Sequence, residues 1–331
     1  MSAAASPATP GLARRWIFGL IALAALLAWP LFVEDQFYQR VGALVMLAAL
    51  SASAWNLVGG YAGLISIGHV LFFGCGAYAS LLGFTWFQWP PILGAPVGVV
   101  LSLLLALLVG GPTLKLKGHY FSMATIALAE LARIIVTNVP VLGGAVGISG
   151  PAMPRSTLDL SFLSPLPYYY IFGGVLAVLL LFTWWMNQGR MGFYLRAIRG
   201  QERAARSLGV PAQRYKMYAL LVSAAFTSLA GSLYAAMVGF VDPDSGLGIL
   251  ISVKMVIAAA LGGAGTLFGP LVGAAILVPL EEITNAVFGG DGTGITYVVY
   301  GAIIVFISRF APGGLAEILA RLQAWRARRV G

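Results

Sequence analysis

The chain has few side chains of the types that perform covalent chemistry. Its 331 residues include two histidines, His69 and His119, and one cysteine, Cys75. A zinc centre needs several such ligands close together, and a disulfide framework needs paired cysteines. Both histidines lie in apolar sequence, where neither can be placed beside a nucleophile and a carboxylate. We therefore expect no catalytic site and no bound metal in this chain.

Motifs for nucleotides and calcium are absent or incomplete in the sequence. It contains no G-x-x-x-x-G-K-[ST] run, so we expect this chain to bind no ATP and no other cofactor. Residues 74–79 fit G-x-G-x-x-A, but they lie in an apolar stretch with no acidic residue about 20 positions later. Asp242 and Asp244 resemble the start of a calcium loop whose terminal glutamate is missing. An exposed polar turn, or a contact for an external partner, fits these two aspartates better.

Two charged residues interrupt an apolar stretch. Glu130 and Arg133 lie three positions apart, hence on one face of a helix, and Thr125 lies about one turn before them. Charges inside a bilayer pair with each other or face a cavity. The two residues therefore either line a polar route or contact a second subunit, or they form a structural ion pair near the outer surface.

Uncharged polar residues mark a second interruption. Ser66 and His69 belong to the run GLISIGH, where unwound backbone would be able to contact a solute; a packing role fits His69 equally well. Asn56 either caps a broken helix or bonds across helices. Together with the charged stretch and two glycine pairs, this gives the candidate translocation-pathway residues, which are Asn56, Gly60, Ser66, His69, Thr125, Glu130, Gly262 and Gly263.

Composition decides the elements that must position these residues. The chain is 60% hydrophobic and 9% charged, against about 25% charged in soluble domains. This balance excludes an ordinary soluble enzyme, a nucleic-acid-binding domain and a disordered protein. At about 20 residues per span, the sequence predicts an all-α polytopic membrane protein with about ten transmembrane helices. They lie near 16–33, 41–58, 68–87, 92–112, 119–138, 167–186, 217–238, 251–268, 270–289 and 295–310.

The distribution of charge predicts the orientation. With a cytoplasmic N-terminus, most of the basic residues fall on the cytoplasmic side and most acidic residues outside, as the positive-inside rule requires. We expect both termini to be cytoplasmic, with 1–13 a mobile tail, 14–312 the transmembrane domain and 313–331 a basic tail. Arg14 and Arg15 resemble a twin-arginine signal, but the apolar run continues to about Val33, so we expect a retained first helix.

Two membrane segments are rich in glycine. Residues 56–79 read NLVGGYAGLISIGHVLFFGCGAYA, and residues 261–275 read LGGAGTLFGPLVGAA. Broken or re-entrant backbone survives in a bilayer only where protein or a water-filled cavity satisfies its polar groups. These segments therefore either line a translocation route or allow close helix packing. Their loosely shared pattern is compatible with an internal repeat.

The connector at 187–216 is the longest loop on the predicted cytoplasmic side. It carries seven bases and one acid. Apolar residues recur at helical spacing from Phe193 to Leu208, which predicts a short amphipathic helix. Gly209 is placed to end it, and Pro211 prevents its continuation. Such a basic helix either rests on anionic lipid headgroups or contacts a partner protein.

Several separated motifs give the chain a family resemblance. The run MGFYLRAIRGQERAARSLGVPAQRYK at 191–216, followed by ALGGAGTLFGPLVGAA at 260–275, resembles the LivM-type permeases of branched-chain amino acid ABC importers. The glycine-rich segment at 56–79 and LKLKGHYFSMATIALAELARI at 114–134 are similar to other motifs of that family. The likeness covers about residues 40–290, and it identifies the family without fixing a substrate.

The resemblance implies a set of partners. These are a second homologous permease (LivH-like), two cytoplasmic ATPase subunits that bind ATP and magnesium, and a periplasmic solute-binding protein docking on the loops around 140–165 and 239–250. The complex would lie in the inner membrane of a bacterium, surrounded by lipid, with no nucleic acid.

The resemblance also assigns a role to the connector. In such importers a coupling helix docks on the ATPase, with a signature similar to Glu-Ala-Ala, three residues, then Gly. Arg203 here occupies the glutamate position, and Glu202 lies one residue early. The residues implied for ATPase coupling are Arg199, Glu202, Ala204, Ala205, Leu208 and Gly209.

Other functions fit the sequence less well. An ion-driven secondary transporter would need buried ionisable residues as a relay, and only Glu130, Arg133 and the pair Glu281 and Glu282 qualify. A membrane-embedded enzyme would need clustered histidine or carboxylate side chains. Within the importer interpretation the substrate stays open between branched-chain or related amino acids and urea, amides or small aromatic or organic acids.

Overall fold

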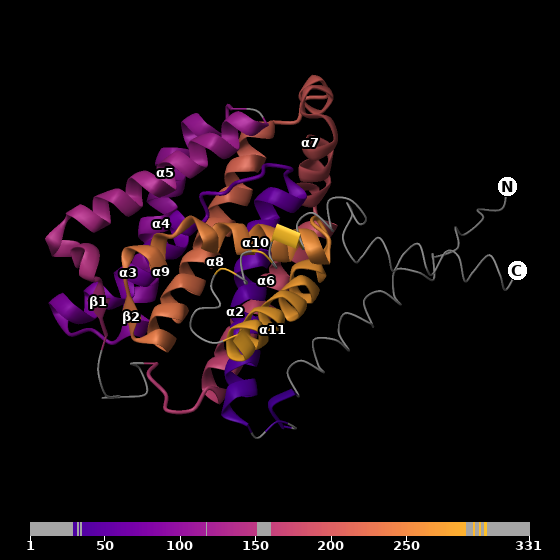
Figure 1. Cartoon of the computed structure of the whole chain (residues 1–331). Helices are drawn as coiled ribbons and strands as arrows, with labels where there is room; N and C mark the ends of the chain where they lie inside the picture. Colours follow the sequence, from indigo (N-terminus) through magenta and orange to yellow (C-terminus); the bar gives the residue numbers. More distant parts are fainter. Residues whose placement is uncertain are drawn as a thin grey trace, which may run out of the picture.

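The protein is described by a computed structural model of the chain, and the part described is almost entirely helical (Figure 1). It covers residues 29–31, 33, 35–116, 118–150 and 160–288, with the isolated positions 294, 298, 301 and 302. The long helices are α2 (Gln36–Asn56), α3 (Val70–Phe87), α4 (Pro91–Thr113), α5 (His119–Asn138), α6 (Leu166–Gln188), α7 (Arg190–Ser207), α8 (Ala212–Val238), α10 (Ile249–Gly262) and α11 (Gly269–Phe288).

Short elements join them. They are the 3-10 turns η1 (Trp29–Leu31), η3 (Pro140–Leu142) and η4 (Gly144–Val146), the π-helical turn η2 (Leu57–Tyr61), the short helix α9 (Pro243–Leu247), and the two-residue strands β1 (Ile148–Ser149) and β2 (Phe240–Val241). The strands pair antiparallel, with Ile148 opposite Val241.

The prediction of membrane-spanning helices is confirmed for the central part of the chain. Among the described residues, seven helical segments are long and apolar enough to cross a membrane. α11 coincides with the predicted span 270–289 but is not among the seven. Most of the predicted span 16–33 and of 295–310, and the two terminal tails, lie outside the described residues, so a total of ten and the cytoplasmic termini stay predictions.

The helices form two packed groups that meet at α2 and α8. α3, α4 and α8 pack against one another, and α2 packs against α6, α10 and α11. Glycine permits the closest approach in the first group: a Cβ atom at Gly76 would overlap the carbonyl oxygen of Ser228, and one at Gly231 would overlap that of Phe73. Small residues let backbones approach in this way in membrane bundles. The packing interpretation therefore holds for the helical part of the first glycine-rich segment.

Two parts of the chain mark opposite ends of the molecule. α7 stands at the top in Figure 1, and the β1–β2 pair lies at the lower left. The strand pair joins the two loops predicted to be external, around 140–165 and 239–250, at the end away from the connector. This arrangement agrees with placing the connector on one side of the membrane and both loops on the other.

Candidate functional site

The first glycine-rich segment is a true interruption of the membrane helices. After α2 the chain forms the π-helical turn η2 and then leaves helical geometry until α3 begins at Val70. Its backbone groups are satisfied by side chains of other helices. Trp55 Nε1 donates to the carbonyl of Ser66 (2.6 Å), and Ser252 Oγ of α10 accepts from the amide of Val70 (2.8 Å). Protein contacts therefore replace the missing helical hydrogen bonds, as the bilayer core requires.

α5 holds the same interruption from its other side. Ser122 Oγ donates to the carbonyl of Ile65 (2.6 Å), and Thr125 Oγ1 accepts from the amide of Ile67 (3.2 Å). A Cβ atom at Gly68 would overlap the backbone of Thr125, so the interruption and α5 touch directly. Thr125 is a predicted pathway residue, and its position supports the path of the backbone.

His69 is fully buried with both ring nitrogens bonded. Nδ1 lies 2.9 Å from Ser66 Oγ and Nε2 lies 2.8 Å from Ser223 Oγ. Because Ser223 Oγ donates its own hydrogen to the carbonyl of Ala54 (2.6 Å), it accepts from His69. We assign the neutral tautomer with hydrogen on Nε2, in which Nδ1 accepts from Ser66. His69 and Ser66 are thus buried and bonded to other protein groups, as the packing interpretation of His69 expects.

The two glycine-rich segments meet at Asn56. Its Nδ2 donates to the carbonyl of Thr266 (2.9 Å), and its Oδ1 accepts from the amide of Gly265 (2.8 Å). A Cβ atom at Gly60 would overlap both Asn56 Oδ1 and the nitrogen of Gly265, so only glycine fits there. The predicted pathway residues Asn56 and Gly60 are therefore the contact between the segments.

The second glycine-rich segment lies between α10 and α11. The predicted span 251–268 is too long, since α10 ends at Gly262 and α11 begins only at Gly269. Gly263 has φ +121°, which ends the helix in a conformation that side chains disfavour, and a Cβ atom at Gly262 would overlap the carbonyl of Gly269. Both glycines are required by this reversal of the chain.

The connector forms the predicted helix, but with an interruption. α7 has non-helical backbone at Gln201 (φ −155°, ψ 97°), so it consists of two rods, 190–200 and 202–207, and the prediction of one continuous helix is wrong there. The predicted stop at Gly209 is confirmed, since its φ is +84°. The amide of Gly209 donates to the carbonyl of Arg206, and the amide of Val210 donates to the carbonyl of Ala205. These paired bonds form a Schellman motif, which fixes the end of the second rod.

The predicted coupling residues divide between two faces of the connector. Ala205 is buried against Ile198 and Ala212, so it packs inside the chain. Ala204, Gly209 and Leu208 are exposed, and the Leu208 side chain is 86% exposed. Leu195, Ile198 and Ala205 are buried, as apolar residues at helical spacing are expected to be, whereas Leu208 lies beyond the last residue of α7 and is exposed.

Glu202 belongs to the inward face. Its carboxylate pairs with Lys216 Nζ at 2.6 Å and with Arg206 at 2.5 Å. Lys216, at the start of α8, is 2% exposed. Burial alone raises the pKa of the Glu202 carboxyl, but the two cations outweigh it and hold the pKa below its ordinary value. Lys216 was not predicted as a site residue, because its partner lies 14 positions away across a turn.

Arg199 points back toward the membrane segments. Its Nη1 donates to the carbonyl of Gly60 (2.6 Å), and the carbonyl of Ala264 lies 3.5 Å away. A Cβ atom at Gly63 would lie 2.9 Å from Arg199 Cγ, so the side chain runs along the first interruption. One connector residue thus touches both glycine-rich segments.

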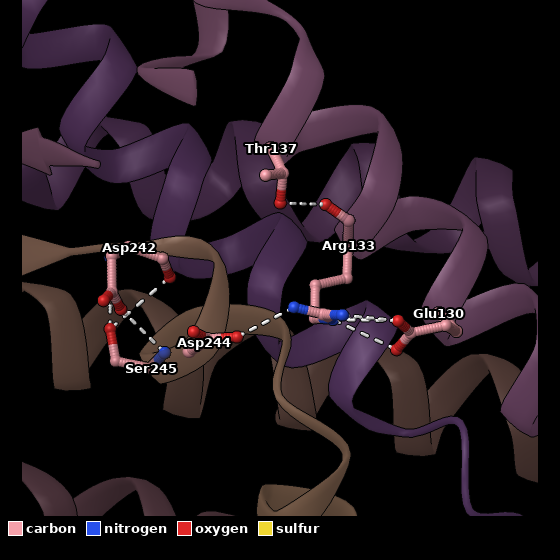
Figure 2. Close-up of polar contacts among 6 residues, drawn as sticks. All are labelled: Glu130, Arg133, Thr137, Asp242, Asp244 and Ser245. Atoms are coloured by element: carbon pink, nitrogen blue, oxygen red, sulfur yellow. Dashed lines mark hydrogen bonds and ion pairs between the residues drawn. The ribbon is translucent and has the colours of Figure 1, made fainter. Parts of the chain in front are cut away.

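A charged cluster lies at the other end of α5. Figure 2 shows Arg133 between Glu130 and Asp244: Nη2 lies 2.6 Å from Glu130 and Nη1 lies 2.9 Å from Asp244. Asp242 caps α9 by accepting from the amide of Ser245 (2.7 Å). The Asp244 side chain is 82% exposed, and the side chains of Glu130 and Arg133 are partly exposed. Glu130 and Arg133 thus form an ion pair, and Asp244 is a third member that sequence spacing did not reveal.

A second ion pair joins α10 and α11. Lys254 Nζ lies 2.5 Å from Glu281, and Glu281 is the more buried partner. No group of three or more histidine, cysteine or acidic residues placed to hold a metal is present within the described ranges.

Comparison with known proteins assigns the family. Residues 38–308 match the family model described as branched-chain amino acid transport system / permease component. The chain belongs to this family. The resemblance to LivM-type permeases drawn from its motifs is thereby confirmed, and the chain is a membrane permease component of an ABC importer. Its homologues are transport subunits, not enzymes.

Individual relatives agree. The chain is similar to the high-affinity branched-chain amino acid transport system permease protein LivM of Escherichia coli (strain K12), with 30% identity covering 81% of this chain and 68% of LivM. LivM of Salmonella typhimurium is 29% identical, over 78% of this chain and 66% of its own length. The permease therefore spans about two thirds of these relatives.

More distant matches have other names. The autoinducer 2 import system permease protein LsrC of Klebsiella pneumoniae is 32% identical over 38% of this permease and 36% of LsrC. Among solved structures, PsaBC from Streptococcus pneumoniae in complex with Fab gives a TM-score of 0.47 and 16% identity, over 88% of this permease and 97% of that chain. That likeness is too weak to extend the assignment.

Proposed function

We propose that this permease moves branched-chain or related amino acids through a bacterial inner membrane. It would act with a second homologous permease (LivH-like), two cytoplasmic ATPases that bind ATP and magnesium, and a periplasmic solute-binding protein. The names and coverage of the LivM relatives support the substrate. The naming of LsrC for autoinducer 2 import indicates that this fold family serves more than one solute.

The observation that carries the proposal is the exposed end of the connector. Leu208 is a large apolar side chain in a basic connector, and the Schellman turn at Gly209 holds it outward. Ala204 lies one helical turn before it on the same exposed surface. Leu208 and Ala204 occupy the part of the connector that the family resemblance implies for the coupling helix, and an exposed leucine there would be covered by the ATPase. We therefore assign Ala204, Leu208 and Gly209 to the ATPase contact, with Glu202 and Ala205 supporting them from inside.

A separate observation, on the hydropathy of the spans, supports a translocation pathway beside α5. Of the seven spans, α5 is the least apolar and is also the least buried within the chain, whereas α4 is the most apolar. A helix facing lipid is expected to resemble α4. The open side of α5 is therefore assigned to the pathway and the second permease. Gly63 and Ile65 of the first interruption are exposed, and Ile65 is bonded to α5 through Ser122.

The external partner is assigned to the opposite end. There β1 and β2 join the two loops, and Asp244 extends the cluster with Arg133 into solvent. Exposed charges at such a surface favour docking through electrostatic complementarity. We assign this end to the solute-binding protein.

Uptake into proteoliposomes tests the function. The permease, its LivH-like partner and the ATPases are reconstituted into liposomes with ATP in the lumen. The binding protein and labelled leucine are added outside, and leucine that enters the lumen is counted. ATP-dependent uptake is expected, and Leu208→Asp is expected to abolish it while membrane insertion is unchanged. Leu93→Asp is the matched control, because Leu93 is 53% exposed and lies at the start of α4, outside the connector and outside the loops assigned to the solute-binding protein.

Three results would contradict parts of the proposal. Uptake driven by a proton or sodium gradient without ATP would favour the secondary-transporter alternative. Equal loss of uptake in both leucine variants would remove the connector from the mechanism. Competition of labelled leucine by urea or aromatic acids, but not by valine or isoleucine, would change the substrate assignment.

A further inference from the structure

The two glycine-rich interruptions end two helices at the same place. η2 finishes at Tyr61 and α10 at Gly262, and Asn56, at the end of α2, bonds the amide of Gly265 and the carbonyl of Thr266 in the second interruption. The last carbonyl groups of a helix have no intrahelical partners and carry the negative end of the helix dipole. The junction therefore gathers carbonyl oxygens that need a donor.

Arg199 supplies that donor from the connector. Its guanidinium bonds the carbonyl of Gly60 at 2.6 Å and lies 3.5 Å from that of Ala264. A Cβ atom at Gly265 would overlap Arg199 Nη1, so the absence of a side chain there makes room for the cation. A planar guanidinium can serve two acceptors at once, which a lysine ammonium on a flexible stem does less well.

The position of Arg199 within α7 gives this contact a mechanical meaning. Arg199 lies two residues before the non-helical Gln201, at the end of the first rod. The second rod carries the exposed Ala204 and Leu208. A displacement of the second rod is therefore transmitted through Gln201 to Arg199, at the adjoining end of the first rod.

We propose that Arg199 links the connector to both membrane interruptions, so that displacement of α7 changes the two segments together. Arg199 is a positioning residue in this scheme. Its charge holds 57–68 and 262–269 in one relative arrangement, and movement of the connector alters that arrangement. The source of the force, an ATPase that moves the connector, rests on the proposed function. The contact between Arg199 and the two segments does not depend on that function.

Hydrogen exchange on the full-length permease in lipid nanodiscs tests the contact. Arg199→Gln is expected to speed exchange about tenfold in both 57–68 and 262–269, because charge-assisted hydrogen bonds are among the stronger ones. Arg199→Lys is expected to give a smaller increase. Arg196→Gln is the matched control, since the hydrogen bonds of the Arg196 side chain within the described residues go to the carbonyls of Gly192 and Asn187. Acceleration in one segment alone, in neither, or equally in the Arg196 variant would overturn the proposal.

Coupling is measured in the reconstituted importer. Arg199→Gln is expected to keep at least about half of the ATP hydrolysis while the amount of solute moved per ATP falls about tenfold. Arg196→Gln is expected to leave that ratio unchanged. An unchanged ratio in the Arg199 variant would overturn the link. Uptake by the unaltered permease without ATP would instead contradict the proposed function, and the exchange experiment would still decide whether Arg199 joins the two segments.

Discussion

The ion pair between Glu202 and Lys216 should respond differently to removal of each partner. Lys216 is 2% exposed, and within the part of the chain that the structure describes, Glu202 is the one carboxylate that pairs with it. Glu202 is 21% exposed and keeps a second cation, Arg206, at 2.5 Å. Losing the carboxylate leaves a buried charge without compensation, whereas losing the lysine leaves a carboxylate that is still paired.

The two losses differ in size. Glu202→Gln is expected to lower the free energy of unfolding by about 3–5 kcal/mol, the usual cost of breaking a buried pair from one side. Lys216→Met keeps the volume of the side chain and is expected to cost about 1 kcal/mol or less. The double variant is expected to resemble Lys216→Met alone, because no unpaired charge remains.

Thermal unfolding of the purified permease in detergent measures the difference. At about 2 °C per kcal/mol for a chain of this size, Glu202→Gln is expected to lower Tm by about 6–10 °C and Lys216→Met by about 2 °C. Equal shifts, or a larger shift for Lys216→Met, would refute the reasoning. A double variant less stable than Glu202→Gln would also refute it.

The pH dependence of the same variants has a defined sign. Because the folded pKa of Glu202 is lowered, its contribution to stability is present above the ordinary glutamate pKa and is lost as the pH falls through the folded value. The Tm difference between the unaltered permease and Glu202→Gln is therefore expected to be constant from about pH 8 to 6 and to shrink below about pH 4.5.

Three further outcomes follow from the geometry. Gly60→Ala is expected to lower Tm clearly, because a Cβ atom at this position would overlap the backbone of the second interruption. Gly111→Ala is the control: a Cβ atom there has open space, so Tm is expected to stay unchanged or to rise. Equal shifts in Tm for the two variants would contradict the contact at Gly60. Arg133→Met is expected to change Tm by less than about 2 °C, because its ion pairs are partly exposed; a larger loss would make the cluster structural. In a permease whose own cysteine is replaced by alanine, Met123→Cys on α5 is expected to react with a membrane-impermeant thiol reagent and Leu108→Cys on α4 is not, and the reverse would remove the pathway from α5.

Local sequence determined the positions of the membrane helices and of the turns that end them. Bilayer thickness and the absence of water in its core impose length and composition, so the apolar runs at 119–138 and 167–186 coincide with α5 and α6 almost residue for residue. Gly209 was assigned correctly as a helix stop because its requirement is local. The predicted span 251–268 is longer than α10, because apolar content does not reveal that the backbone geometry changes at Gly263.

Tertiary structure alone decided how the polar residues pair and which way they face. His69 bonds Ser223 across 154 positions, Arg133 bonds Asp244 across 111, and Arg199 bonds Gly60 across 139. Local periodicity carries no information about such distant partners, because they depend on which helices pack together. Leu208, which the apolar spacing groups with the buried residues of the connector, likewise lies outside because α7 ends at Ser207. The apolar pattern is set residue by residue by the lipid solvent, whereas each polar contact requires two segments to be brought together by the fold.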